Sequence, residues 1–200
     1  MTIEDIDALE FDITCPSCKS NDVEVSQKIL DIPHFSKVWL YNIKCNNCGY
    51  KHNDMLNLES KEATRYIYRV ENAKDYSSKI VRSANGTVRI PELGVMIEPG
   101  PSSTGFINNI EGVLQDVKEK VQFLLKNTQS EGEREKIVHY INQLNSYIER
   151  SLPLTFILED PLGNSLIVPY DEEKLTVEIL TEEEALKLKT GYLIFSTKKS

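Results

Sequence analysis

The sequence contains no long apolar run. None approaches the roughly 18 consecutive apolar residues that a membrane-spanning helix requires, so we expect no membrane segment. The first residues, MTIEDIDALEFDI, are acidic and lack the basic-then-apolar layout of a secretory signal. The sequence therefore predicts a cytoplasmic protein, in a compartment that keeps thiols reduced.

Common catalytic and nucleotide-binding motifs are also missing. The sequence has no P-loop, no Gly-x-Ser-x-Gly and no Gly-x-Gly-x-x-Gly. Histidine occurs three times, as His34, His52 and His139, and these form no His-x-His or comparable cluster. Because nothing indicates a catalytic metal held by clustered histidines, we expect the protein not to be an enzyme.

Cysteine is scarce and confined to two tight pairs. The stretches CPSC and CNNCGYKHND hold all four, which are Cys15, Cys18, Cys45 and Cys48. In a reducing compartment, two C-x-x-C pairs predict a tetrahedral zinc site. Disulfides and a thioredoxin-like redox pair are the alternatives, but a redox motif needs one pair beside a βαβ pattern. Because four thiolates leave no open position on the metal, we expect one structural zinc ion.

The residues that follow the cysteine pairs differ in how well they suit a tight metal-binding turn. Gly49 follows Cys48 at a position that favours a positive φ. Lys19 follows Cys18 where a second glycine would be expected. The first turn is therefore predicted to be the less favourable of the two.

Two strand-like segments between the cysteine pairs predict a zinc ribbon over residues 1–56. DVEVSQKIL and KVWLYNIK are rich in alternating β-branched and aromatic residues. DIPHFS between them contains a proline and is typical of a turn or loop. Trp39, the single tryptophan, favours the core over a contact surface. Each cysteine pair is thus expected at an end of a β-hairpin.

The ribbon offers four candidates for partner binding, which are His34, Phe35, Tyr50 and His52. Because four cysteines already complete a zinc site, both histidines are predicted to be surface or partner-contact residues. Phe35 is an apolar residue in a turn, so it either packs into the ribbon core or anchors a partner. The sequence leaves both roles open.

Residues 57–200 are predicted to form a second, mostly β domain. RYIYRVENAKDYSSKIVRSANGTVRIPELGVMIEPG alternates strand-like stretches with turn signals, and Asn85-Gly86 predicts a hairpin turn. After residue 152 the strand-like segments LTFILED, SLIVPY, KLTVEIL and GYLIFST follow. EDPLGNS between the first two predicts a tight turn, and TEEEALKLK is compatible with a short helix.

A helical hairpin is predicted to interrupt these strands at about residues 105–151. Ser103 or Thr104 is placed to cap the first helix, and the pattern breaks near Gly132. The apolar stripes have coiled-coil spacing, so we expect the helices to bury each other, with their other faces free for a partner. The stripe residues are Ile107, Ile110, Leu114, Val117, Val121 and Leu124, then Ile137, Ile141, Leu144 and Ile148. The fold predicted is mainly β, a zinc ribbon before an all-β domain with a helical insertion, and not a βαβ protein.

Charge is unevenly distributed. The net charge is −8, yet residues 61–89 carry seven Lys or Arg against three acids. Residues 155–188 carry nine acids against two lysines. A solvated face is the usual meaning of such runs. A functional basic patch would suit an acidic protein or a phosphate, and a functional acidic patch a basic protein.

Several unusual blocks recur together in one known family. CPSC, DIPHFSKVWLYNIKCNNCGYKHND, RVENAKDYSSKIVRSANGTVRIPELGVMIEPG, TGFINNIEGVL and LEDPLGNSLI resemble, in order, the ZPR-type zinc-finger protein family. The resemblance runs from about residue 11 to about residue 170. Eukaryotic members carry two copies of a module of ribbon plus β-domain, whereas this chain resembles the single-module archaeal members.

The resemblance implies a fold, a metal and a partner. The second domain would be a double-stranded β-helix (β-sandwich-like) with an inserted helical hairpin, and the zinc ligands would be Cys15, Cys18, Cys45 and Cys48. Eukaryotic members bind the translation GTPase elongation factor one-alpha and act as its folding chaperone, so this GTPase is the partner that the resemblance suggests.

Nucleic-acid binding, in transcription or translation, is the alternative function, because zinc ribbons often serve it. Residues 13–52 carry five lysines, three acids and no arginine. Since arginine is the usual base-reading residue, sequence-specific readout is not indicated, and binding to the phosphate backbone would depend steeply on salt.

Overall fold

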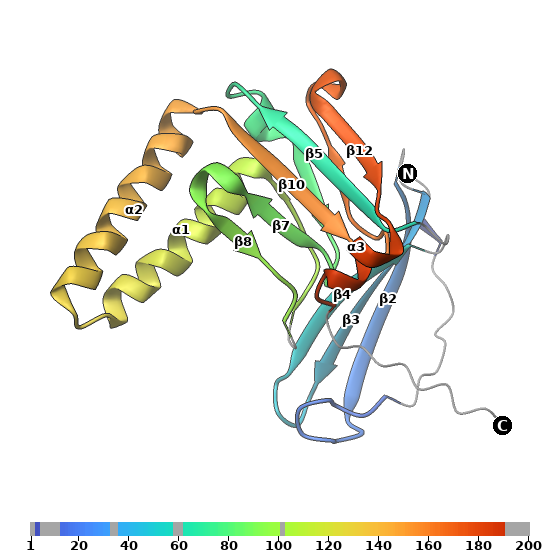
Figure 1. The fold of residues 1–200 in the computed structure, drawn as a ribbon. Helices are drawn as coiled ribbons and strands as arrows, with labels where there is room; N and C mark the ends of the chain where they lie inside the picture. The colour runs from blue at the N-terminus through green and yellow to red at the C-terminus, as the bar shows by residue number, and fades with distance from the viewer. Residues whose placement is uncertain (1–2, 5–12, 33–35, 58–61, 101–102, 191–200) are drawn as a thin grey trace.

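The computed structural model describes residues 3–4, 13–32, 36–57, 62–100 and 103–190. The molecule consists of an N-terminal sheet, a pair of facing sheets and a helical hairpin. The N-terminal sheet and the hairpin project from different sides of the facing sheets (Figure 1). No helix among the described residues is long and apolar enough to cross a bilayer.

The N-terminal sheet is the predicted ribbon. Its antiparallel strands lie in the order β1 (Ile3–Glu4), β2 (Val23–Ile32), β3 (Ser36–Cys45) and β4 (Lys51–Asn57). Alternation places one row of side chains on the buried face, so Tyr41, Ile43 and Ile29 are buried. Trp39 is half-buried and donates its indole N–H to Gln27. Residues 33–35 of the predicted turn lie outside the described residues.

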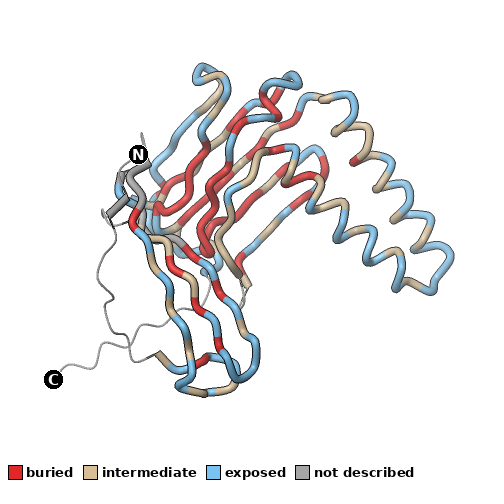
Figure 2. Tube along the Cα trace, turned by 180° about the vertical axis from the view of Figure 1, so that it is seen from behind, coloured by how far each residue is buried: buried red, intermediate tan, exposed pale blue. Residues whose placement is uncertain are grey.

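The second domain is a sandwich of two antiparallel sheets. The five-stranded sheet has the order β12-β5-β10-β7-β8 and the three-stranded sheet the order β11-β6-β9. Their apolar faces enclose one core, which includes Tyr68, Phe156, Leu158 and Ile80 (Figure 2). The mainly β prediction is confirmed. The strands are β5 (Thr64–Val70), β6 (Lys79–Arg82), β7 (Thr87–Ile90), β8 (Val95–Ile97), β9 (Phe106–Asn109), β10 (Leu154–Asp160), β11 (Leu166–Val168) and β12 (Leu175–Ile179).

The hairpin predicted at Asn85-Gly86 is wrong. β6 and β7, which flank this dipeptide, belong to different sheets and do not pair. Glycine is needed at position 86 because of close packing: an added Cβ would lie 2.7 Å from Ser165 Oγ and 2.9 Å from Arg82 Cγ. The chain crosses from one sheet to the other here, and the segment is buried.

The tight turn predicted in EDPLGNS is confirmed. Gly163 has φ +65°, and the Asp160 carboxylate accepts the Leu162 N–H at 2.8 Å. This turn also crosses between sheets, from β10 to β11.

The helical pair is confirmed, with shifted ends. α1 (Ile110–Asn127) and α2 (Glu131–Arg150) are antiparallel and project from the sandwich (Figure 1). Ser103 and Thr104 do not cap α1: the Asn109 side chain accepts the Gly112 N–H at 2.7 Å. Residues 106–109 pair with β6 instead of starting the helix, which explains the late start.

The break between the helices and the seam also differ from the prediction. Residues 128–130 separate the helices, and Gly132 lies inside α2. Leu124, predicted in the seam, is exposed. The short helix α3 (Glu182–Lys187) forms as the sequence suggested, with a capping box between Thr181 and Glu184. GYLIFST falls outside the described residues.

Candidate metal centre

Four cysteine sulfurs meet at one end of the ribbon. Their Sγ atoms all lie within 4.8 Å of one another. The Sγ atoms of Cys15 and Cys48 are 3.6 Å apart, as are those of Cys18 and Cys45. A tetrahedron with Zn–S bonds of about 2.3 Å has sulfurs about 3.8 Å apart, so the arrangement fits one zinc ion. None of the four forms a disulfide.

The backbone folds the same way around each cysteine pair. In the first knuckle Lys19 N–H donates to Cys15 C=O and Cys15 N–H to Ser20 C=O, at 2.9 and 2.8 Å. In the second, Gly49 N–H donates to Cys45 C=O and Cys45 N–H to Tyr50 C=O, at 3.0 and 2.8 Å. These bonds turn both thiols of each pair toward one point.

Both knuckles require a left-handed residue directly after the second cysteine. Gly49 has φ +73° and Lys19 has φ +62°. A side chain with a Cβ is strained in this region, so the unequal suitability predicted from the sequence has a structural basis.

Replacing Lys19 with glycine should stabilise the first knuckle slightly. The left-handed conformation costs a non-glycine residue about 1–2 kcal/mol, which glycine would not lose. Glycine also gives the unfolded chain more conformational freedom, and this offsets part of the stabilisation. We expect a net increase in unfolding free energy of about 0.5 kcal/mol, measured by denaturant titration of the zinc-loaded protein. Lys51→Gly, in a strand, is the control and should destabilise. A destabilised Lys19→Gly would contradict the strain argument.

The surroundings favour a thiolate at Cys18. The Asn47 side-chain amide lies 3.5 Å from the Cys18 sulfur and, with the backbone at Ser20, lowers the pKa of that thiol to about 6. Cys15 and Cys45 are buried, whereas Cys18 is half-buried and Cys48 exposed. The metal would thus lie near the surface, bound by two buried sulfurs and two more exposed ones.

The partner-binding candidates have different locations. His34 and Phe35 lie outside the described residues, and Tyr50 is half-buried. The prediction that His52 is a surface residue is wrong. The residue is 5% exposed, and its ring stacks on that of Tyr50 with centroids 6.5 Å apart. The pairing of β3 with β4 explains this burial, because His52 lies opposite Ile43 and on the same buried face of the sheet.

The contact between ribbon and sandwich depends on a residue that sequence reasoning missed. Asp54 is buried, and its carboxylate accepts the Ala84 N–H at 2.9 Å. Asn53 C=O accepts the Gly105 N–H at 3.1 Å, and Leu40 packs against Val81 and Leu166. Asp54 lies two residues after His52 on β4, so both side chains point to the same, buried face. This spacing could have indicated burial, but both residues are polar and did not form an apolar pattern.

Next to this contact lies a buried polar cluster, defined here as Ser83, Asp160 and Ser165. Asp160 Oδ2 accepts both serine hydroxyls, at 2.6 Å from Ser83 and 2.5 Å from Ser165. Ser165 Oγ in turn accepts the Ser83 N–H at 3.0 Å. The cluster joins the two sheet crossings, residues 83–86 and 160–165.

Three arginines of the basic run at residues 61–89 are bound within the sandwich. Arg65 and Arg89 both bind Glu159, each at 2.8 Å. Arg82 is buried, and its guanidinium donates to Gly86 C=O. These three charges therefore serve the sandwich itself, whereas three other described basic residues of the run are exposed.

Comparison with known families fits this architecture. The ZPR1 zinc-finger domain matches residues 7–59, and the ZPR1 jelly-roll domain matches residues 74–190. The chain belongs to the ZPR1 family. The sheets of the second domain are thus a jelly roll, and the family resemblance inferred from the sequence blocks is confirmed, as is one structural zinc.

Relatives in archaea match along nearly their whole length. A ZPR1-like protein of Methanocaldococcus jannaschii is 38% identical over 184 residues, which are 91% of each chain. One of Pyrococcus horikoshii is 39% identical over 182 residues, covering 88% of this chain and 80% of that protein. The zinc finger chaperone zpr1 of Schizosaccharomyces pombe is 29% identical over 178 residues, but only 38% of its length is covered.

Proposed function

We propose that this chain is a zinc-dependent chaperone or adaptor that binds the translation GTPase elongation factor one-alpha. The observation that carries the proposal is the hairpin tip, defined here by Phe123 and Leu124 near the end of α1. These side chains are 67% and 56% exposed, on a helical pair that projects from the jelly roll (Figure 1). Grouped exposed apolar side chains mark sites of protein contact.

The hairpin is braced so that its tip is presented in a fixed orientation. The Arg134 guanidinium donates to the Leu125 and Thr128 carbonyls, both at 3.0 Å, and so closes the end of α1 against α2. Tyr140 Oη donates to Leu93 C=O at 2.8 Å and ties α2 to the jelly roll, beside the buried Leu144. A pre-ordered surface loses less conformational entropy on binding.

Along the side of α1, next to the tip, lies a hollow that suits an apolar side chain of a client. Phe123 and Leu124 line it together with Asp116, Glu119 and Lys120, around a volume of about 390 Å³. Apolar and charged side chains also lie together on protein-binding surfaces, where polar residues surround an apolar centre.

Three further points support a protein partner over catalysis or nucleic acid. The Schizosaccharomyces pombe relative is named a zinc finger chaperone. Four thiolates leave no coordination position for a substrate, so we propose binding without enzymatic activity. The paired arginines of residues 61–89 leave less charge for phosphates. Elongation factor one-alpha, suggested by the family resemblance, would place the chain in the cytoplasm.

Refolding of purified elongation factor one-alpha tests the proposal. We expect the zinc-loaded chain to raise the yield of GTP-binding factor after dilution from denaturant. The double variant Phe123→Ser/Leu124→Ser should bind the factor at least about tenfold more weakly and lose most of this gain, because buried apolar anchors dominate interfaces.

Gln122→Ser, at an exposed position on the same helix, is the matched control and should behave as the unchanged chain. Equal refolding yields with and without the chain, together with no complex in a binding titration, would overturn the proposal. A steeply salt-dependent affinity for RNA under the same conditions would favour the nucleic-acid alternative instead.

A further inference from the structure

Strand β12 forms an open edge of the jelly roll. It is the last strand of the five-stranded sheet and pairs with β5 alone among the described strands. It lies on the opposite side of the molecule from the tip of the α1–α2 hairpin (Figure 1). An unpaired edge is a template for another strand, and proteins usually protect it.

The backbone groups on this edge alternate in direction. Leu180 N–H donates to Ala63 C=O at 2.8 Å, so by antiparallel alternation residues 178 and 176 also face β5. The N–H and C=O groups of Leu175, Val177 and Ile179 therefore point outward. No described strand pairs with them.

The outward-facing positions also carry exposed apolar side chains. Val177 and Ile179 are 53% and 57% exposed, whereas Leu175, on the same face of the strand, packs against the core. A charge placed inward on an edge strand would block pairing, and no such charge occupies these three positions. The edge thus offers both hydrogen bonds and apolar contact.

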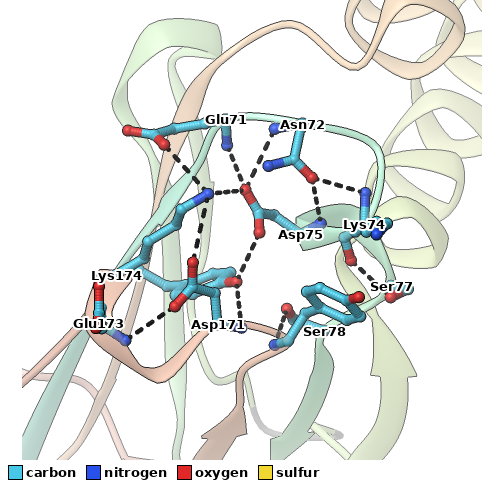
Figure 3. A network of polar contacts seen from close by, with 11 residues as sticks. Glu71, Asn72, Lys74, Asp75, Ser77, Ser78, Asp171, Glu173 and Lys174 are labelled. Atoms are coloured by element: carbon cyan, nitrogen blue, oxygen red, sulfur yellow. Dashed lines mark hydrogen bonds and ion pairs between the residues drawn. The ribbon is translucent and has the colours of Figure 1, made fainter.

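Ion pairs fix both ends of this edge. Lys174, directly before β12, has its ammonium 2.8 Å from Asp75 and 3.1 Å from Glu71 (Figure 3). Burial raises the pKa of the Asp75 carboxyl, but hydrogen bonds from Lys174, the Glu71 N–H and Tyr68 outweigh it and leave the pKa lowered. At the other end, Glu178 binds Arg65 at 3.2 Å.

Acidic side chains flank the edge and determine what it can accept. Glu172 and Glu173 precede β12, Glu182 and Glu183 follow it, and all four are exposed and form no ion pair with any described residue. Two copies pairing antiparallel through β12 would bring the acids of one beside those of the other, which like-charge repulsion disfavours.

We propose that β12 is a docking edge for an extended segment of a partner protein, with alternating β-branched residues between lysines or arginines. The segment would add a sixth strand to the sheet, with its apolar residues against Val177 and Ile179 and its cations near the flanking glutamates. This surface is independent of the hairpin tip, so the refolding assay and the test of β12 can fail separately.

The test uses a synthetic fluorescent peptide, Lys-Lys-Val-Thr-Val-Thr-Val-Lys-Lys, titrated into the zinc-loaded full chain and followed by anisotropy and amide NMR. We expect saturable binding, with the largest shifts at Val177 and Ile179. A peptide with glutamate for every lysine should bind at least about tenfold more weakly, because its ends repel the flanking acids. Two further peptides carry N-methyl groups on the valines or on the threonines. One of the two should lose binding and the other should keep it, because the N–H groups of only one set face β12.

A double variant, Val177→Lys/Ile179→Lys, should lose at least about tenfold in affinity. Met96→Lys/Ile107→Lys adds the same charge at exposed positions on β8 and β9, away from β12, and should lose far less. A melting curve checks the fold of both variants. Equal affinity of the basic and acidic peptides, no preference between the methylated sets, or equal losses in the two double variants would overturn the proposal. Self-association of the chain that the peptide cannot displace would overturn it in favour of a second copy.

Discussion

The Cys45→Ser variant should bind no zinc and should lose the fold of the ribbon. Cys45 lies at the end of β3, is fully buried, and has its sulfur 3.6 Å from that of Cys18. Apart from the cysteines, the buried apolar residues described in this sheet are few, namely Ile29, Tyr41 and Ile43. Since structural zinc contributes about 10–16 kcal/mol of apparent binding free energy, the metal supplies most of the stability of such a sheet.

The loss should stop at the ribbon. The jelly roll has its own core around Tyr68, Phe156 and Leu158, and no described ribbon residue belongs to that core. Amide NMR should therefore show collapse of signals from β2 and β3 while signals from β10 persist. Metal analysis should show the bound zinc falling from one ion per chain to none.

Ser17→Ala is the matched control, because Ser17 is an exposed residue of the same knuckle that supplies no ligand. It should keep the metal and the ribbon signals. A Cys45→Ser protein that retains one zinc, or a metal-free ribbon with an unchanged amide spectrum, would contradict a structural metal centre.

The zinc site could be predicted because its determinants are local. Each knuckle is closed by bonds within six residues, from Cys15 to Ser20 and from Cys45 to Tyr50, so the cysteine spacing alone carries the information. The helices were predictable for the same reason, since their apolar periodicity is internal. Their ends were not: residues 106–109 are drawn into β9 by pairing with β6, which no local pattern reveals.

The sheet topology could not be predicted because strand partners lie far apart in the sequence. β5 pairs with β10 across more than eighty residues, and Arg65 meets Glu159 through that pairing. Asn85-Gly86 indicated a hairpin because the dipeptide favours a tight turn locally. The strands on either side of it instead pair with distant strands in two different sheets. His52, Asp54 and Asp160 were missed as buried residues because a polar side chain is placed inside by its partners, which the sequence does not show.

Asp160→Ala should be among the most destabilising single substitutions in the jelly roll. Its carboxylate accepts two buried hydroxyls and the Leu162 N–H, so the substitution leaves three donors without this acceptor. Each buried donor left without an acceptor costs about 1–3 kcal/mol. We therefore expect a loss of at least about 3 kcal/mol in unfolding free energy, measured by urea denaturation of the zinc-loaded protein.

Further variants show whether the destabilisation comes from the lost hydrogen bonds or from the lost negative charge. Glu182→Ala removes an exposed acid and should change stability by less than about 0.5 kcal/mol. Adding Ser83→Ala and Ser165→Ala to Asp160→Ala should cost less than the three single losses together, because the hydroxyls no longer need an acceptor. Bound zinc should stay at one per chain throughout, since Asp160 lies in the jelly roll and the sulfurs in the ribbon. Strict additivity, or an Asp160→Ala loss below about 1 kcal/mol, would show that the cluster does not hold the two sheet crossings together.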